Sequence, residues 1–138
     1  MTRWAIRFAS TGKRAGTKRV KRWQFVSFPG PAGRESRGIV DLIAIRRDHG
    51  PAKGAFLSGD LFEIVLVQIK GGTAAWPTVA DLERLAAVRR RYRAKAVVLA
   101  SWRKGAEPRF YVLRRVSAVR SEAWEEATPI ELFGSGAA

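Results

Sequence analysis

Three polar side chains lie where two apolar segments, residues 38–45 and 61–70, are expected to form β-strands. Both segments are rich in β-branched residues and are bounded by glycine, proline or charge. Asp41 lies in the first segment, and Gln68 and Lys70 end the second. Side chains alternate along a strand, so Gln68 and Lys70 share one face. Because a buried carboxylate or ammonium group is costly unless it is paired or bound to a metal, this pattern indicates a site for a divalent cation and a water molecule.

This pattern resembles the PD-(D/E)XK nuclease superfamily, which includes type II restriction enzymes, archaeal Holliday-junction resolvases and many repair nucleases. The family has an Asp in one strand, an acidic-x-Lys triplet at the end of the next, and then a helix and another strand. Asp41 matches the first position, and residues 68–70 (Gln-Ile-Lys) match the triplet, with glutamine in place of the usual acid. Residues 38–41 (Gly-Ile-Val-Asp) are similar to the Gly-x-Pro-Asp version of the family, with Val40 replacing proline. The resemblance covers residues 38–112.

The resemblance implies metal-dependent hydrolysis of phosphodiester bonds. Asp41, Gln68 and the backbone carbonyl of Ile69 would bind Mg²⁺ or Mn²⁺, and Lys70 would position or activate the attacking water. The catalytic residues that it implies are therefore Asp41, Gln68 and Lys70. Magnesium prefers oxygen ligands and acts as a Lewis acid beside the scissile phosphate.

Glutamine at position 68 leaves the implied site with one carboxylate beside a lysine, so its affinity for a divalent ion should fall. Either another acid completes the site, or the domain binds nucleic acid without cutting it. Glu35, which precedes Asp41 in a flexible lead-in, is the candidate for the missing acid. Two weaker candidates precede or begin the second strand: Asp60 and Glu63. A purely structural alternative is an ion pair between Asp41 and Lys70 at the sheet edge.

The composition favours a folded protein with a polyanionic partner. The chain has 138 residues, of which 46% are hydrophobic, and a formal net charge of +14 from 26 Lys and Arg against 12 Asp and Glu. This excess favours DNA, with RNA as an alternative and an anionic membrane less favoured. The absence of cysteine excludes disulfides and cysteine catalysis. No apolar run approaches the roughly 20 residues that span a bilayer. Nothing resembles a secretory signal, so we expect a cytoplasmic protein without a membrane partner.

We expect one domain over residues 1–138, divided into a basic N-terminal segment (1–34), a core (35–116) and a C-terminal extension (117–138). Residues 1–34 contain no acid. A solvated tail and an organellar transit peptide are alternatives for this segment, but its interleaved aromatic residues favour a nucleic-acid surface. For arginines near the end of a predicted helix, the alternative to phosphate contact is complementing the helix dipole. The residues expected to contact nucleic acid are Lys13, Arg14, Lys18, Arg19, Lys21, Arg22, Arg89, Arg90 and Arg91.

The remaining patterns predict an α/β fold similar to restriction endonucleases, with a mixed sheet of about five strands and one long helix. Residues 77–92 predict a helix that Thr78 caps, with Asp81 three residues later. A strand over residues 95–101 follows, and such a strand–helix–strand crossover favours parallel pairing with the strand that ends at Lys70. Two further elements are expected toward the C-terminus: a strand over 109–114 and a short helix over 121–126.

Three functions follow from these observations. The leading hypothesis is a magnesium-dependent nuclease that acts on DNA, including branched or damaged DNA. The second is a non-catalytic nucleic-acid-binding module that has the same fold without the second acid. The third is a basic RNA- or ribosome-associated protein unrelated to nucleases, which is favoured if Asp41 and Lys70 are far apart. A homodimer is expected only by analogy with resolvases of this fold.

Overall fold

The computed structural model describes residues 23–28 and 38–134. They form a six-stranded sheet in which the spatial order of the strands follows the chain. The strands are β1 (Gln24–Ser27), β2 (Leu42–Arg47), β3 (Phe62–Gly71), β4 (Ala96–Trp102), β5 (Arg109–Leu113) and β6 (Trp124–Ala127). The predicted α/β class with a mixed sheet is confirmed, whereas the expected number of about five strands was one too few.

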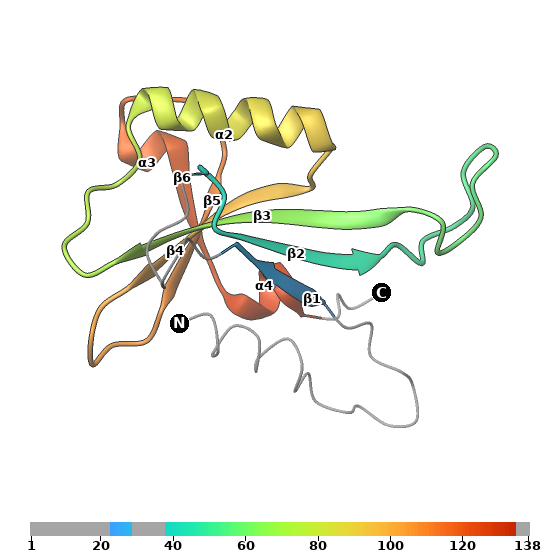
Figure 1. Cartoon of the computed structure of the whole chain (residues 1–138), viewed down its shortest axis with the longest axis horizontal. Helices are drawn as coiled ribbons and strands as arrows, with labels where there is room; N and C mark the ends of the chain where they lie inside the picture. Colours follow the sequence, from blue (N-terminus) through green and yellow to red (C-terminus); the bar gives the residue numbers. More distant parts are fainter. Residues whose placement is uncertain (1–22, 29–37, 135–138) are drawn as a thin grey trace.

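The pairing of β3 with β4 determines where the candidate site lies. β1, β2 and β3 pair antiparallel in turn, β3 and β4 pair parallel, and β4, β5 and β6 pair antiparallel. Helix α2 (Val79–Tyr92) joins the parallel pair, which confirms the predicted crossover. Because β3 and β4 run in the same direction, they end at one edge, where Lys70 is opposite Ser101. The loops after both strands therefore meet at one end of the molecule, on the left in Figure 1.

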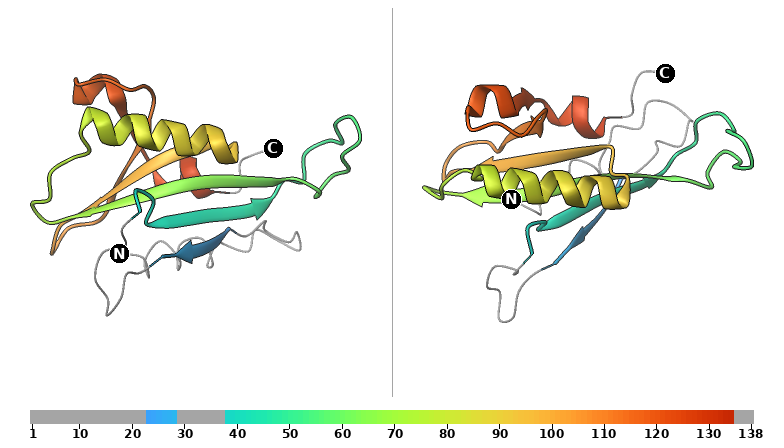
Figure 2. Two further views of the ribbon diagram at one scale, coloured as in Figure 1. Left: turned by 45° about the horizontal axis from the view of Figure 1, so that its top comes forward. Right: turned by 90° about the horizontal axis from the view of Figure 1, so that it is seen from above.

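Helix α2 begins with the capping box that the sequence predicts. Thr78 Oγ1 accepts a hydrogen bond from the N–H of Asp81 (3.2 Å), and the Asp81 carboxylate accepts one from the N–H of Thr78 (3.0 Å). The helix runs along the strands that it connects (Figure 2). Its own residues Leu82 and Leu85 are buried in the apolar cluster between the helix and the sheet. Within the described residues, neither α2 nor any other helix is long and apolar enough to cross a membrane.

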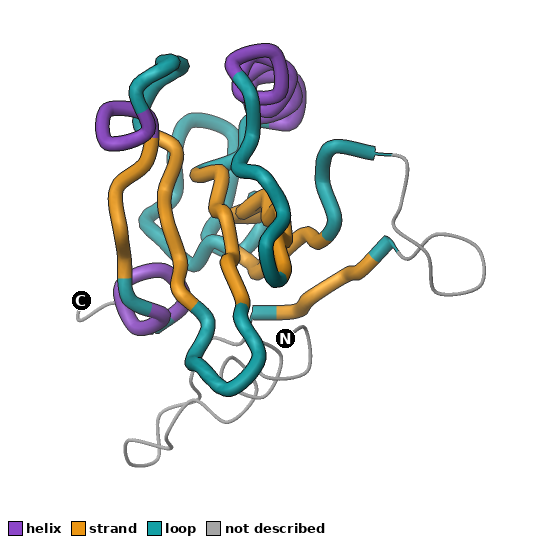
Figure 3. Tube along the Cα trace, turned by 90° about the vertical axis from the view of Figure 1, so that its left-hand side faces the viewer, coloured by secondary structure: helices purple, strands orange, loops and turns teal. Residues whose placement is uncertain are grey.

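Helices cover both faces of the sheet, as Figures 1 and 3 show. Leu66 of β3 and Leu85 of α2 belong to an apolar cluster on one face. Val67 of β3 and Phe133 of α4 (Pro129–Phe133) belong to the cluster on the opposite face. Consecutive residues of β3 thus alternate between two buried layers, as expected for a strand covered on both sides. This alternation also determines the face to which the side chains of residues 68–70 point.

The prediction of a helix over residues 121–126 was wrong for its second half. Helix α3 covers Arg120–Ala123, and the chain then pairs with β5 as the strand β6. A helix of six residues has little stability by itself. Pairing with β5 satisfies the backbone hydrogen bonds and buries Trp124, while Glu125 and Glu126 remain exposed. Residues 117–134 therefore contribute to the same sheet and the same core as the preceding strands.

Candidate active site

Asp41 immediately precedes β2 and contacts the end of β3 through its backbone and its side chain. Its N–H donates to the carbonyl of Val67 (3.0 Å), and its carboxylate Oδ2 accepts a hydrogen bond from the N–H of Ile69 (2.7 Å). The backbone carbonyl of Asp41 accepts from the N–H of Phe28, next to β1 (3.1 Å). The carboxylate thus takes the position of a backbone carbonyl at the end of the β2–β3 pairing. The acid and the triplet 68–70 are brought together.

Gln68 is a buried polar side chain, only 6% exposed. It lies two residues after Leu66, so it points to the face covered by α2. Its Oε1 atom is buried and has no hydrogen-bond partner within residues 23–28 and 38–134. An unsatisfied buried acceptor costs about 1–3 kcal/mol. The Gln68 oxygen is therefore positioned to accept a hydrogen bond from water or to coordinate a cation.

The backbone carbonyl of Ile69 is the third oxygen of this group. The N–H and C=O of one strand residue point toward the same neighbouring strand, and the Ile69 N–H points to Asp41. The β2–β3 ladder ends at the pair Leu42–Val67, so Ile69 lies beyond it. No group of three or more His, Cys, Asp or Glu that could hold a metal occurs among the described residues. A divalent ion would therefore need the amide and backbone oxygens, which are donors that magnesium accepts.

Lys70 points to the same face as Gln68 and lies next to the start of α2. The pKa of the Asp81 carboxyl is lowered, chiefly by the hydrogen bond from the Thr78 N–H and also by the positive charge of Lys70. Sequence reasoning treated Asp81 only as a helix cap. Its position relative to Lys70 depends on the path of the loop formed by residues 72–78, so no local pattern in the sequence signals it. The alternative was a structural ion pair between Asp41 and Lys70. In the structure, the Asp41 carboxylate accepts a hydrogen bond from the Ile69 N–H, and the positive charge of Lys70 contributes to lowering the pKa of Asp81.

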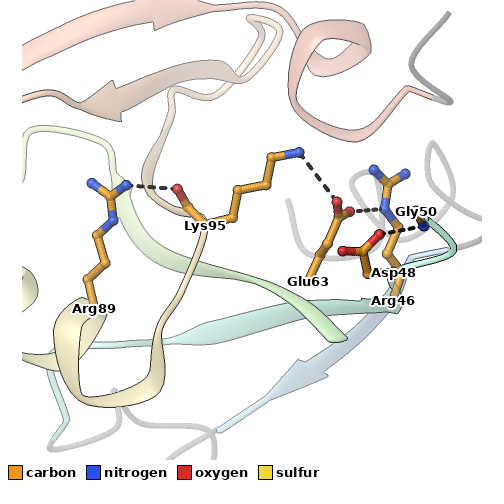
Figure 4. Close-up of polar contacts among 6 residues, drawn as sticks. All are labelled: Arg46, Asp48, Gly50, Glu63, Arg89 and Lys95. Carbon is orange, nitrogen blue, oxygen red and sulfur yellow. Dashed lines mark hydrogen bonds and ion pairs between the residues drawn. The ribbon is translucent and has the colours of Figure 1, made fainter. Parts of the chain in front are cut away.

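The two weaker candidates for a second metal-binding acid are used elsewhere. Glu63 lies near the opposite end of β3, where it forms ion pairs with Arg46 and Lys95 (Figure 4). It is five residues from Gln68, which is about 16 Å along a strand. Asp60 lies in the loop between β2 and β3 and accepts a hydrogen bond from a backbone N–H (2.8 Å). Neither carboxylate belongs to the group around Asp41.

The arginines at the end of α2 differ from one another. Arg89 donates from Nε to the carbonyl of Ala94 (3.2 Å) and from Nη2 to that of Lys95 (2.9 Å), which holds the turn into β4 (Figure 4). Arg90 and Arg91 are exposed in the last turn. The other residues predicted to bind nucleic acid or metal lie outside the described residues: Lys13, Arg14, Lys18, Arg19, Lys21, Arg22 and Glu35.

Comparisons with known protein families, with curated proteins and with solved structures find no match for this chain. The functional interpretation therefore depends on the chemistry of the sheet edge. That edge combines one carboxylate, a lysine, and a buried amide oxygen that has no hydrogen-bond partner among the described residues.

Proposed function

We propose that this protein is a divalent-metal-dependent nuclease whose active site is formed by Asp41, Gln68, Ile69 and Lys70. The observation that carries this proposal is the hydrogen bond from the Ile69 N–H to the Asp41 carboxylate (2.7 Å). It holds an acid against a triplet whose lysine shares a face with a buried amide oxygen, and that oxygen has no hydrogen-bond partner in the part of the chain that the structure describes. An unsatisfied buried oxygen lowers stability, so a strand end with a purely structural role gains nothing from it.

The order of the elements supports the same proposal. Asp41 leads into β2, the triplet ends β3, and α2 and then the parallel strand β4 follow. This is the arrangement of acid, triplet, helix and strand that the PD-(D/E)XK nucleases share. The restriction endonuclease-like fold is accordingly part of the proposal.

Each residue of the site has a chemical task. Magnesium or manganese held by the Asp41 carboxylate, the Gln68 Oε1 and the Ile69 carbonyl would supply a Lewis acid next to the scissile phosphate. Lys70 orients the attacking water and offsets negative charge that develops on the phosphate. The basic surfaces of the chain hold the nucleic-acid backbone, with DNA as the expected substrate.

A second function, nucleic-acid binding without cleavage, is favoured by one observation. The described residues place a single carboxylate, that of Asp41, against the triplet, and they contain no cluster of three metal-binding side chains. Weak metal binding would leave a domain that binds DNA or RNA but does not cut it. An RNA-associated protein unrelated to nucleases is less favoured, because Asp41 bonds to the residue next to Lys70.

The test is cleavage of labelled linear, single-stranded and four-way-junction DNA in magnesium, in manganese and in chelator. Asp41→Asn keeps an oxygen that can accept from Ile69, and Lys70→Met keeps the length of the side chain. We expect metal-dependent cleavage that each substitution lowers by about 100-fold or more. Matched controls are Asp60→Asn and Lys53→Met in the β2–β3 loop, which should cut like the wild type. Tight binding with no cleavage in either metal would reject the nuclease and leave the binding module.

A further inference from the structure

A pocket of about 460 Å³ has Lys70 in its lining, and its other lining residues have no part in the chemistry described above. We call it the Lys70 pocket. Its walls come from the loop after β3, the loop after β4, the start of β5 and the first residue of α3. These segments meet because β3 and β4 end at the same sheet edge. The cations that line it are Lys70, Arg103, Arg109 and Arg120.

The charges of the Lys70 pocket are poorly balanced. Glu107 is the one acid among the described residues that line it, against four cations. Arg109 has a distant partner outside the lining, since its Nε lies 3.9 Å from Glu126 Oε1. Both of these side chains are more than half exposed, and ion pairs between exposed side chains contribute little to stability. A concave surface with this excess of positive charge attracts an anion.

Aromatic packing fixes one of these cations in place. The Arg120 guanidinium carbon lies 3.2 Å from the centre of the Trp76 ring. Trp76 is held in turn by edge contacts with Tyr111 (4.7 Å) and Trp124 (6.1 Å between ring centres). An arginine stacked on an aromatic face keeps its planar set of N–H donors available for a phosphate. The hydroxyl of Ser101 in the same wall adds a neutral donor.

We propose that the Lys70 pocket binds a phosphate group of the nucleic-acid strand, next to the phosphate that lies at Asp41 and Lys70. This inference rests on the proposed function for the position of the scissile phosphate. Lys70 belongs both to the candidate active site and to the pocket wall, so a strand that passes Lys70 enters the pocket. Phosphates follow one another by about 3.4 Å of helix axis along each strand, which places a neighbouring phosphate within reach. The phosphate is either an internal phosphodiester or a terminal phosphomonoester.

The test measures binding of a fluorescent oligonucleotide in chelator, so that cleavage cannot occur. The pocket variant is Arg103→Gln with Arg120→Gln, and the matched control is Arg114→Gln with Arg115→Gln, which removes the same charge elsewhere. We expect the pocket variant to bind about tenfold more weakly, with a shallower dependence of binding on salt, and the control to bind like the wild type. Arg103→Gln alone, in an exposed loop, keeps the test valid if the loss of Arg120 disturbs Trp76. Thermal unfolding of each variant establishes that it is folded.

Three oligonucleotides separate the sources of the phosphate: one without terminal phosphate, one with a 5′-phosphate and one with a 3′-phosphate. An equal loss for all three indicates an internal phosphate, and a loss confined to one phosphorylated form indicates that terminus. Equal affinities of the pocket variant and the control for every oligonucleotide would overturn the inference, even if cleavage depends on Asp41. Pocket-dependent binding by a protein that never cleaves would instead support the pocket and reject the nuclease.

Discussion

The two ends of helix α2 are both rich in cations, but they differ in how those charges are balanced. At the N-terminal end, the Lys70 pocket places four cations around one lining acid. At the C-terminal end, the described residues that line a groove of about 510 Å³ include no acid and five arginines, namely Arg89, Arg90, Arg93, Arg114 and Arg115, some of which have partners outside the lining. Here Arg114 lies 2.6 Å from Glu125 and Arg115 lies 2.8 Å from Glu122. The same residue type therefore serves different purposes at the two ends.

Three of the five arginines that line the C-terminal groove, Arg89, Arg114 and Arg115, have partners within the fold. Arg89 donates to two backbone carbonyls, and Arg46 and Lys95 share Glu63 (Figure 4). Cations with such partners hold turns and strand ends in place. At the N-terminal end, Gln68 Oε1 has no hydrogen-bond partner among the described residues, and the cations that line the Lys70 pocket outnumber its lining acid by four to one. The contrast predicts that substitutions at one end affect stability and that those at the other affect ligand binding.

The largest effect should come from Gln68→Glu at the N-terminal end. A carboxylate at the buried position 68, near the partly buried Asp41, should lower stability in chelator by about 2 kcal/mol, because burial and the like charge disfavour its ionised form. Millimolar magnesium or manganese should restore much of this loss, because the site would then have two acidic ligands. The measurement is the midpoint of thermal unfolding with metal and with chelator. Gln68→Met is the control, and it should not respond to metal. An absence of any metal response in Gln68→Glu would place the cation site elsewhere.

The next effect tests the C-terminal end. Arg89→Met removes two hydrogen bonds to the carbonyls of Ala94 and Lys95, so it should lower the free energy of unfolding by about 1–2 kcal/mol. Urea titration measures this change. Arg91→Met, in the exposed last turn, is the control and should change stability by less than about 0.5 kcal/mol. If Arg89→Met left stability unchanged and instead weakened nucleic-acid binding, the contrast between the two ends would fail.

The smallest effect concerns Asp81, whose carboxylate caps α2. The Thr78 hydrogen bond lowers its pKa in the folded protein, so Asp81 contributes stability above its unfolded pKa, and this contribution is lost as pH falls through the folded value. Asp81→Asn should therefore cost about 0.5–1 kcal/mol at pH 7 and progressively less in acid. Urea titrations at several pH values measure this, with Glu83→Gln in the same helix as the control. A cost that stayed constant into acid would mean that the charge of Asp81 has no part in it.

The sequence by itself determined the local elements of this fold. Two apolar segments, one ending at Lys70 and one covering residues 95–101, predicted two strands. The Thr78–Asp81 capping box predicted the start of the helix between them. Their parallel pairing followed from the crossover rule. These features depend on alternation, helical periodicity and capping within a few residues, so a single sequence carries them. The meeting of Asp41 with the triplet, which joins residues 28 positions apart, was predicted from the polar residues in two strand-like segments and from the family resemblance.

Only the tertiary structure decided which groups surround that pair. The strand β6 formed where a helix was expected, because pairing with β5 and burial of Trp124 outweighed a weak local preference. The positive charge of Lys70 reaches Asp81 and lowers its pKa because the loop after β3 brings the start of α2 back toward the sheet edge. The Lys70 pocket combines residues from position 70 to position 120, and it exists because β3 and β4 end together. The meeting of distant loops is a long-range property of the fold, and no pattern within a few residues of the sequence encodes it.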